Sequence, residues 1–303
     1  MKPPVFAYHA PRSVEETLEL LAQLGAEAKV LAGGQSLVPM LNMRLVAPAV
    51  LVDIRHLDDL DTVEVADGRV RVGARVRHRR LERDDAAHAA QPVLREALEL
   101  VAHPVIRNRG TSVGSIVHAD PAAELPAVVA LLDARLELTS RDGVRHVTGA
   151  DAFLGPLESA LRPGELATAV EFPVRSPYGG AAVEELARRH GDYALAGVAA
   201  QVDLDEDRRV TAAKAAFFGV GGEPAAIDVG QALAGQPADA LRVDDAVGLA
   251  RDGLDPDDDI HATASYRRHL AGVLLGRALV RAAAAATTPT AASTPDPARE
   301  VHA

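Results

Sequence analysis

Cysteine is absent from all 303 residues of the chain. Disulfides, thiolate-bound iron–sulfur clusters and cysteine-type zinc sites are therefore excluded. If the protein exchanges electrons with iron–sulfur clusters, another chain must carry them. Tryptophan is also absent, and aromatic residues make up only 3% of the chain. Alanine, valine and leucine must therefore fill the core.

Basic residues are in the minority, with 32 against 43 acidic ones and a formal net charge of -11. Nucleic-acid-binding proteins normally need a basic face, so we expect no nucleic-acid partner. No uncharged apolar run approaches the roughly 20 residues of a membrane span, and the first residues lack the apolar segment of a secretory signal. We therefore expect a cytoplasmic protein without a transmembrane segment. The histidines and aspartates lack the spacing of a metal site, so no metal is expected on this chain.

The order of expected elements is typical of an α+β protein, and the length suffices for two or three compact units. Ser13 and Glu16 form a capping-box pattern before a helix that should end at Gly25. Short apolar runs over 28–32 and 50–54 predict buried strands.

Further along the chain, hairpins and helices alternate. Apolar residues alternate around turn pairs at 67–68 and 142–143, which predicts two hairpins. A helical stripe covers 94–101. The Asp-Pro pair at 120–121 predicts the start of another helix, with the aspartate as its N-cap.

Turn-forming residues over 175–180 predict a domain boundary. Beyond it, strand patterns predict an antiparallel sheet, with strands near 183–189, 194–204 and 210–219. Helices are expected near 224–234, 238–253 and 264–286. The tail over 287–303 is rich in Ala, Thr and Pro, so we expect it to be disordered.

A glycine pair directly follows the strand expected at 28–32. Gly33 and Gly34 permit positive φ and place no Cβ in the path of a ligand. Successive amides can then converge on an anion such as phosphate, and Ser36 adds a hydroxyl donor. A plain tight turn is the alternative interpretation of these residues.

A second segment rich in small residues runs from Arg109 to Ser115 and leads to the helix expected at 120–121. It offers hydroxyl donors, and the partial positive charge of a helix start favours a diphosphate. A loop shaped for close packing is the alternative. Two such loops about eighty residues apart suit a diphosphate ligand with two ends, although neither G-x-G-x-x-G nor the P-loop pattern occurs.

Five longer signatures occur in a fixed order. They are KVLAGGQSLVPMLNMRL at 29–45, IRNRGT at 106–111, HADPAAELP at 118–126, RRHGDYA at 188–194, and DIH at 259–261 running on to YRRHL at 266–270. In this order and spacing they closely resemble the FAD-binding (medium) subunit of the xanthine dehydrogenase and aerobic carbon monoxide dehydrogenase family of molybdenum hydroxylases. The resemblance spans roughly residues 1–285.

The resemblance implies an α+β chain with the vanillyl-alcohol-oxidase-like (PCMH-type) FAD-binding fold. Two α/β lobes would cover 1–55 and 56–175. A C-terminal domain over 176–286, with a three-stranded antiparallel sheet and a helix bundle, would cover the isoalloxazine.

The resemblance also implies where non-covalent FAD is bound. Two loops would hold its diphosphate: Ala32, Gly33, Gly34, Gln35, Ser36 and Leu37 in the first, and Thr111, Ser112, Val113, Gly114 and Ser115 in the second. Glu124, with Asp120 one turn before it, falls where a family acid approaches the nucleotide portion.

Asp192 and Tyr193 match the segment that covers one face of the isoalloxazine, for which a flat aromatic ring is suited. A half-buried aromatic at a strand end is the alternative for Tyr193. Val113 occupies a position where the family has glycine, so that backbone either has negative φ or is reshaped, and the contacts of Ser112 and Val113 stay open.

For activity, the resemblance implies electron transfer without a catalytic acid or base on this chain. Substrate would be hydroxylated at a molybdopterin centre on a large subunit. Electrons would pass through two [2Fe–2S] clusters on a small subunit to this FAD, and on to NAD, a quinone or oxygen. The assembly implied is a dimer of heterotrimers. Carbon monoxide, purines, N-heterocycles and aldehydes are all open as substrates. Two other functions remain: a self-contained flavin oxidoreductase, and a flavin-free bridging subunit.

Overall fold

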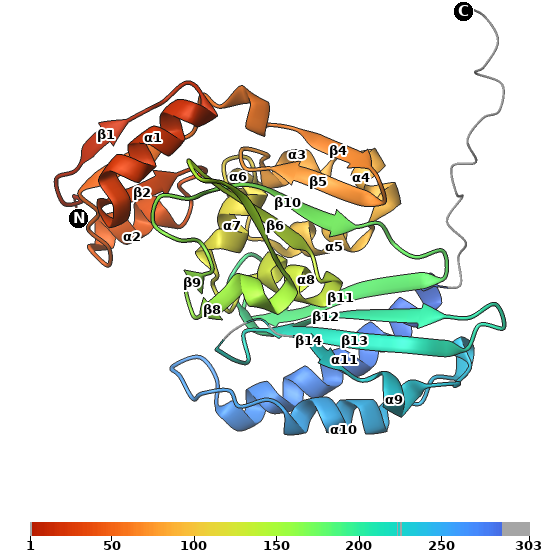
Figure 1. Cartoon of the computed structure of the whole chain (residues 1–303). Coiled ribbons are helices and arrows are strands. Elements are labelled where there is room, and N and C mark those ends of the chain that lie inside the picture. The colour runs from red at the N-terminus through yellow and green to blue at the C-terminus, as the bar shows by residue number, and fades with distance from the viewer. Residues whose placement is uncertain (1, 223, 225, 287–303) are drawn as a thin grey trace, which may run out of the picture.

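The computed structural model describes residues 2–222, 224 and 226–286, and its larger sheets lie one after another along the chain (Figure 1). The tail expected to be disordered, 287–303, lies outside these residues. The first sheet has three parallel strands in the order β1-β3-β2. Its strands are β1 (Ala7–His9), β2 (Ala28–Leu31) and β3 (Val50–Asp53).

Two α-helices accompany this first sheet, α1 (Val14–Leu24) and α2 (Leu37–Met43). Helix α1 begins as predicted, because the Ser13 hydroxyl accepts a hydrogen bond from the Glu16 amide at 3.1 Å. It ends at Gly25, whose φ of 53° suits glycine. The 3-10 helices Gly25–Glu27 and Asp58–Leu60 follow α1 and β3 respectively.

The second sheet is antiparallel, with five strands in the order β4-β5-β10-β6-β7. Both predicted hairpins are confirmed, and Asp67 and Gly68 have positive φ at the turn of the first. The strands are β4 (Val63–Ala66), β5 (Arg69–Gly73), β6 (Arg135–Ser140), β7 (Gly143–Thr148) and β10 (Leu166–Pro173). A 3-10 helix, Gly149–Ala152, and a small pair, β8 (Phe153–Gly155) and β9 (Glu158–Ser159), precede β10.

Six helices lie between β5 and β6. They are α3 (His78–Glu82), α4 (Asp85–Ala90), α5 (Val93–Leu100), α6 (Pro104–Arg107), α7 (Ser112–His118) and α8 (Glu124–Leu132). The prediction of a helix start at 120–121 is wrong. The Asp120 carboxylate accepts the Ala122 amide at 2.9 Å, which makes a local turn, and α8 begins only at Glu124. A helix already begins at Ser112, inside the segment taken for a loop.

The C-terminal sheet is antiparallel and has four strands: β11 (Gly179–Ala187), β12 (Ala194–Leu204), β13 (Val210–Phe218) and β14 (Ala226–Asp228). It therefore has one strand more than expected. Residues 226–228 pair with 214–216, where a helix over 224–234 was predicted. The half-buried Ile227 between exposed neighbours fits a strand, and α9 is confined to Gly230–Leu233.

Helices cover both faces of this sheet (Figure 1). Helices α5 and α8 pack on one face, and α11 (Ala264–Ala286) packs on the other. The 3-10 helix Ala238–Ala240 and α10 (Asp244–Asp252) lie beside α11. By length and composition α11 would also suit a membrane span, but 56% of its apolar window is buried in the fold. We therefore describe α11 as a core helix.

Candidate functional site

The two small-residue loops lie against each other. We call residues 32–37 the first loop and 111–115 the second loop. A Cβ added to Gly33 would lie 2.5 Å from the Arg109 carbonyl oxygen, just before the second loop, and 2.9 Å from the amide nitrogen of Thr111 at its start. A Cβ on Gly114 would lie 3.7 Å from that of Ala32. Only glycine at position 33 permits this backbone-to-backbone contact, which joins the two segments singled out in the sequence.

Backbone amides of the first loop have no partner in the part of the chain that the structure describes. The first bonds of α2 run from Val38 and Met40 back to carbonyls of the loop, at 3.1 and 3.2 Å. In the described part of the chain, no acceptor pairs with the amides of 34–37, which are only partly buried. Four consecutive unpaired donors are available to an anionic ligand.

The second loop also holds unpaired donors. The Ser112 and Ser115 amides bond to carbonyls of the protein, whereas those of 113 and 114 find no acceptor among the residues described. The hydroxyl of Thr111 is buried and has no hydrogen-bond partner there either. A buried polar atom without a partner is costly, so this hydroxyl is available to bond to a ligand.

Ser112 and Val113 differ from their neighbours because both side chains are buried, with exposed fractions of 0% and 2%. The Ser112 hydroxyl lies 3.4 Å from Nδ1 of His78, within the protein. Val113 lies in α7 and does not have positive φ. A side chain at the position where the family has glycine is therefore accommodated without strain.

A buried ion pair holds the segment before the second loop. Arg107 is 6% exposed, and its Nε donates to the Glu82 carboxylate at 2.9 Å. Its Nη1 donates to the carbonyls of Val101 and Ala102 at 3.0 and 3.1 Å. Sequence reasoning missed this role of Arg107, although the residue lies in the 106–111 signature.

His78 supports the same segment from α3. Its amide donates to the Gly110 carbonyl at 2.9 Å, and a Cβ on Gly110 would lie 2.7 Å from the His78 ring. Burial, with the charge of Arg107 nearby, lowers the pKa of His78 to about 4. The imidazole is therefore neutral at physiological pH and acts as a packing partner of the loop.

Acidic side chains gather where the start of α8 meets the C-terminal sheet. Burial raises the pKa of Glu124 to about 8, and the charges of Glu185 and Asp120 act in the same direction. Burial raises the pKa of Glu185 to about 7, and its Oε2 has no hydrogen-bond partner in the residues described. Glu124 is therefore mostly protonated at neutral pH and Glu185 is partly protonated, and a protonated carboxyl can donate a hydrogen bond. Glu185 was missed from sequence, where it reads as an ordinary strand residue.

Tyr193 and Asp192, expected near the isoalloxazine, differ in their partners. Burial of the Tyr193 hydroxyl and the charge of nearby Asp120 raise its pKa, yet the residue keeps 66% of its surface exposed. From its place just before β12, Tyr193 therefore joins the acidic group while its ring stays accessible. Asp192 instead pairs with Arg189 at 3.0 Å, which lowers the pKa of the aspartate.

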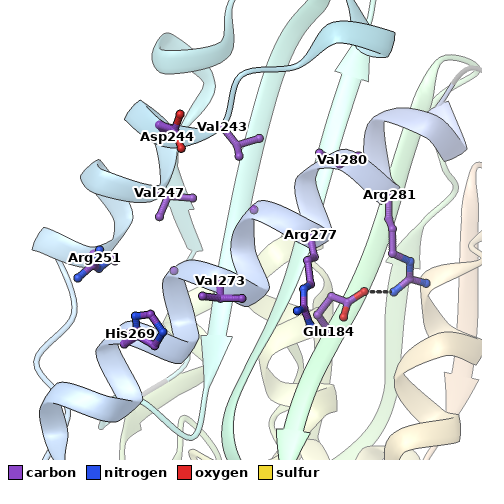
Figure 2. A pocket seen from close by; sticks show the side chains of 12 residues that line it. Glu184, Val243, Asp244, Val247, Arg251, His269, Val273, Arg277, Val280 and Arg281 are labelled. Carbon is purple, nitrogen blue, oxygen red and sulfur yellow. Dashed lines mark hydrogen bonds and ion pairs between the residues drawn. The ribbon is translucent and has the colours of Figure 1, made fainter.

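A hollow of about 690 Å³ lies elsewhere, between α10, α11 and β11 (Figure 2). Arg281 pairs with Glu184 at its edge, at 2.6 Å, and Arg277, His269 and Arg251 also line it. No residue of either loop contributes to it. We therefore assign the site to the loop junction and not to this hollow.

Comparison with known proteins decides the family. Residues 4–175 match the model of the FAD binding domain in molybdopterin dehydrogenase, and 181–282 match the CO dehydrogenase flavoprotein C-terminal domain. The chain belongs to this flavoprotein family. It is 39% identical over 292 residues to the 6-hydroxypseudooxynicotine dehydrogenase complex subunit alpha of Paenarthrobacter nicotinovorans, covering 93% of this chain and 96% of that one. It is 38% identical over 287 residues to the carbon monoxide dehydrogenase medium chain of Afipia carboxidovorans, covering 94% and 99%.

Solved structures of relatives match the flavoprotein along almost its whole length. Carbon monoxide dehydrogenase from Oligotropha carboxidovorans has a TM-score of 0.89 at 36% identity, covering 94% of this chain and 100% of that one. Quinoline 2-oxidoreductase from Pseudomonas putida 86 has a TM-score of 0.86 at 37% identity, covering 94% and 99%. The predicted α+β FAD-binding fold is confirmed. The chain is an FAD-dependent oxidoreductase subunit, which removes the flavin-free alternative.

The loop junction fits FAD on its own geometry. The glycine contact at Gly33 keeps side chains out of the junction, and free amides line both loops. The unpaired Thr111 hydroxyl adds a further donor. A diphosphate needs such a set of short, convergent donors.

Proposed function

We propose that this flavoprotein takes electrons from [2Fe–2S] clusters of a small partner subunit and passes them through FAD to an external acceptor. Hydroxylation of the substrate would occur at a molybdopterin centre on a large partner subunit. The absence of cysteine supports this division, because the clusters need thiolates that this chain lacks. Relatives with similar sequences are described as a medium chain or as a subunit of a complex.

FAD binding rests on one observation: the Gly33 contact brings two sets of unpaired amides together beside the unpaired Thr111 hydroxyl. We propose that the diphosphate of FAD is held by the backbone of the first loop and by Thr111, Val113 and Gly114 of the second. The buried hydroxyl of Ser112 is directed to His78 and supports the loop from behind.

In this proposal, three segments of the chain have separate roles. Residues 1–55 and 56–175 would form the two FAD-binding lobes. Residues 176–286 would cover the ring, with the accessible face of Tyr193 against it. Glu124 and the protonated fraction of Glu185 would donate hydrogen bonds to polar atoms of the cofactor.

Bound FAD supplies the exchange between one-electron and two-electron carriers. The chain's own residues bind the diphosphate, orient the ring and keep the neighbouring carboxyls protonated. NAD, a quinone and oxygen all remain as acceptors. We propose a cytoplasmic dimer of heterotrimers, in which the large subunit selects among carbon monoxide, purines, N-heterocycles and aldehydes.

Reconstitution tests this proposal. The purified chain, incubated with FAD and desalted, should retain about one flavin per chain and show visible flavin absorbance. Coexpressed with its molybdenum and iron–sulfur partners, it should copurify with them, and its flavin should be reduced by substrate only within the complex. Substrate turnover by the isolated flavin-loaded chain would overturn the electron-transfer role and favour a self-contained flavoenzyme. A chain that binds no FAD would overturn the site.

A further inference from the structure

The signature at 259–261 and 266–270 contains an ion pair that no part of the proposed FAD site uses. Arg267, in the first turn of α11, is 8% exposed. Its Nη2 donates to the Asp259 carboxylate at 2.7 Å. Asp259 also accepts the amides of His261 and Ala262, at 2.8 and 2.9 Å. These bonds hold the pKa of Asp259 below its usual range and fold residues 259–262 around its carboxylate.

Arg267 fixes the backbone on the C-terminal side of Tyr193. Its Nη1 donates to the carbonyl of Leu195 at 2.6 Å and to that of Gly219 at 2.7 Å. Leu195 lies two residues beyond Tyr193, near the start of β12. One buried guanidinium therefore holds the ends of two neighbouring strands and the 259–262 segment together.

Gly219 extends this contact to the turn before α8. Its amide donates to the Pro121 carbonyl at 2.8 Å, next to Asp120, whose charge raises the pKa of Tyr193. A Cβ on Gly219 would lie 2.7 Å from the Ala194 carbonyl oxygen, and its φ is 73°, so glycine is required there. The backbone after Tyr193 and the backbone beside Asp120 are thus held through the same residue.

The other end of the Tyr193 segment meets the same structure. Arg188 lies 3.2 Å from Nδ1 of His261 through its Nη1. The segment from 188 to 195, which we call the Tyr193 turn, is therefore held at both ends by residues of the 259–267 signature.

We propose that Arg267 and Asp259 are positioning residues that set the place of the Tyr193 ring over the flavin. This inference rests on the proposed placement of Tyr193 beside FAD. The pair touches neither the loops nor, in this account, the cofactor, and acts only through the Tyr193 turn.

Arg268 provides a matched control. It is the next residue of α11, and it bonds to the Leu254 carbonyl at 3.1 Å and lies 3.5 Å from the Asp255 carboxylate. Arg267→Gln and Arg268→Gln therefore remove the same charge one residue apart, and only the first releases the Tyr193 turn. Asp259→Asn is a milder second variant, because it leaves the two carbonyl bonds of Arg267 in place.

Hydrogen exchange of the FAD-free chain is the first measurement. Amides over 191–197 should exchange about tenfold faster in Arg267→Gln, because hydrogen bonds from a charged donor are lost. Asp259→Asn should give a smaller acceleration, and Arg268→Gln should match the parent chain. If Arg267→Gln does not fold, the exchange rates of Asp259→Asn are compared with those of its control, Asp255→Asn, and that comparison tests the proposal. Equal rates over 191–197 in each variant and its control would overturn the proposal.

Flavin emission of the FAD-loaded chains is the second measurement. A tyrosine stacked on the ring quenches flavin emission, so Arg267→Gln should be brighter, toward the level of Tyr193→Ala. Arg267→Lys should be intermediate, since one ammonium cannot replace every bond of the guanidinium. Faster exchange with unchanged flavin emission would show that Arg267 and Asp259 stabilise the Tyr193 turn but do not position the Tyr193 ring over the flavin. Failure to bind FAD at all would instead overturn the proposed function, while the exchange result would still decide whether the pair holds the turn.

Discussion

The two loops of the FAD site are built in different ways. The second loop follows a segment fixed by the buried Arg107–Glu82 pair and by His78, so protein side chains set its position before any ligand arrives. The first loop has no comparable support in the described residues: its one side-chain bond to backbone runs from Gln35 to the carbonyl of Gly33, at 3.1 Å. It is placed by α2 and by the contact of Gly33 with the second loop.

The two loops therefore contribute differently to binding. The second loop is held rigidly by the protein, and the first loop packs its backbone against it while its own amides stay unpaired. Substitutions behind the second loop should therefore act mainly on stability. Substitutions at the junction should act mainly on FAD affinity.

Arg107→Met should have the largest effect on stability. It removes one of the two arginines that pair with the buried Glu82 carboxylate, leaving Arg79, and strips bonds from two carbonyls, which costs about 2–4 kcal/mol. Denaturant unfolding of the FAD-free chain measures this loss. Arg109→Met, at an exposed position of the same signature, is the control and should change stability by less than about 0.5 kcal/mol. Equal effects of the two would contradict the assigned anchoring role.

Gly33→Ala should separate the loops. Its new Cβ would lie 2.5 Å from a backbone oxygen that cannot move aside easily, so we expect about 1–3 kcal/mol of destabilisation. FAD affinity should fall by about a hundredfold or more, because misplaced donors lose their convergence on the diphosphate. Gly221→Ala is the control, since a Cβ there meets nothing within 4 Å. If Gly33→Ala binds FAD as tightly as the parent chain, the contact between the two loops is not part of the FAD site.

Glu185→Gln should stabilise the FAD-free chain in a defined pH window. Burial raises the pKa of Glu185 from 4.5 to about 7. As pH rises, the Glu185 carboxyl therefore ionises in the unfolded chain at a lower pH than in the folded chain. That ionisation favours unfolding progressively between about pH 4.5 and 7, and glutamine abolishes it. Partial solvation reduces the effect, and we expect about 1–2 kcal/mol of added stability at pH 7.5 and almost none at pH 4. Urea unfolding at both pH values measures this, and a gain that does not depend on pH would contradict the buried-carboxyl assignment.

Thr111→Val should have the smallest effect, with opposite signs for stability and binding. It removes a buried hydroxyl that has no partner in the described structure, so the FAD-free chain should gain up to about 1 kcal/mol. FAD affinity should fall about fivefold because a donor to the cofactor is lost. Unfolding and FAD titration on the same samples measure both. A fall in both quantities would show that the hydroxyl serves the fold instead.

Sequence reasoning predicted much of the fold because local rules determine those elements. Ser13 sets the start of α1, and the turn at 67–68 sets the first hairpin. It was wrong at 120–121, where the aspartate forms a local turn instead of capping a helix, and at 226–228, which pairs as a strand. The choice in both places depends on tertiary neighbours that a local pattern does not contain.

The site was predicted in part for the same reason. Gly33 and Thr111 lie in small-residue segments that can be recognised locally. The contact between these segments, the burial of Arg107 and the unpaired Glu185 arise only when distant elements pack. The resemblance located the segments that bear these residues without indicating what each side chain does.

The most direct test of the account is amide exchange of the chain with and without saturating FAD. We predict that slowing concentrates at the amides of 34–37 and of 113–114, the donors that lack protein partners. Slowing around the hollow between α10 and α11, with these amides unchanged, would contradict the central claim that the joined loops hold FAD.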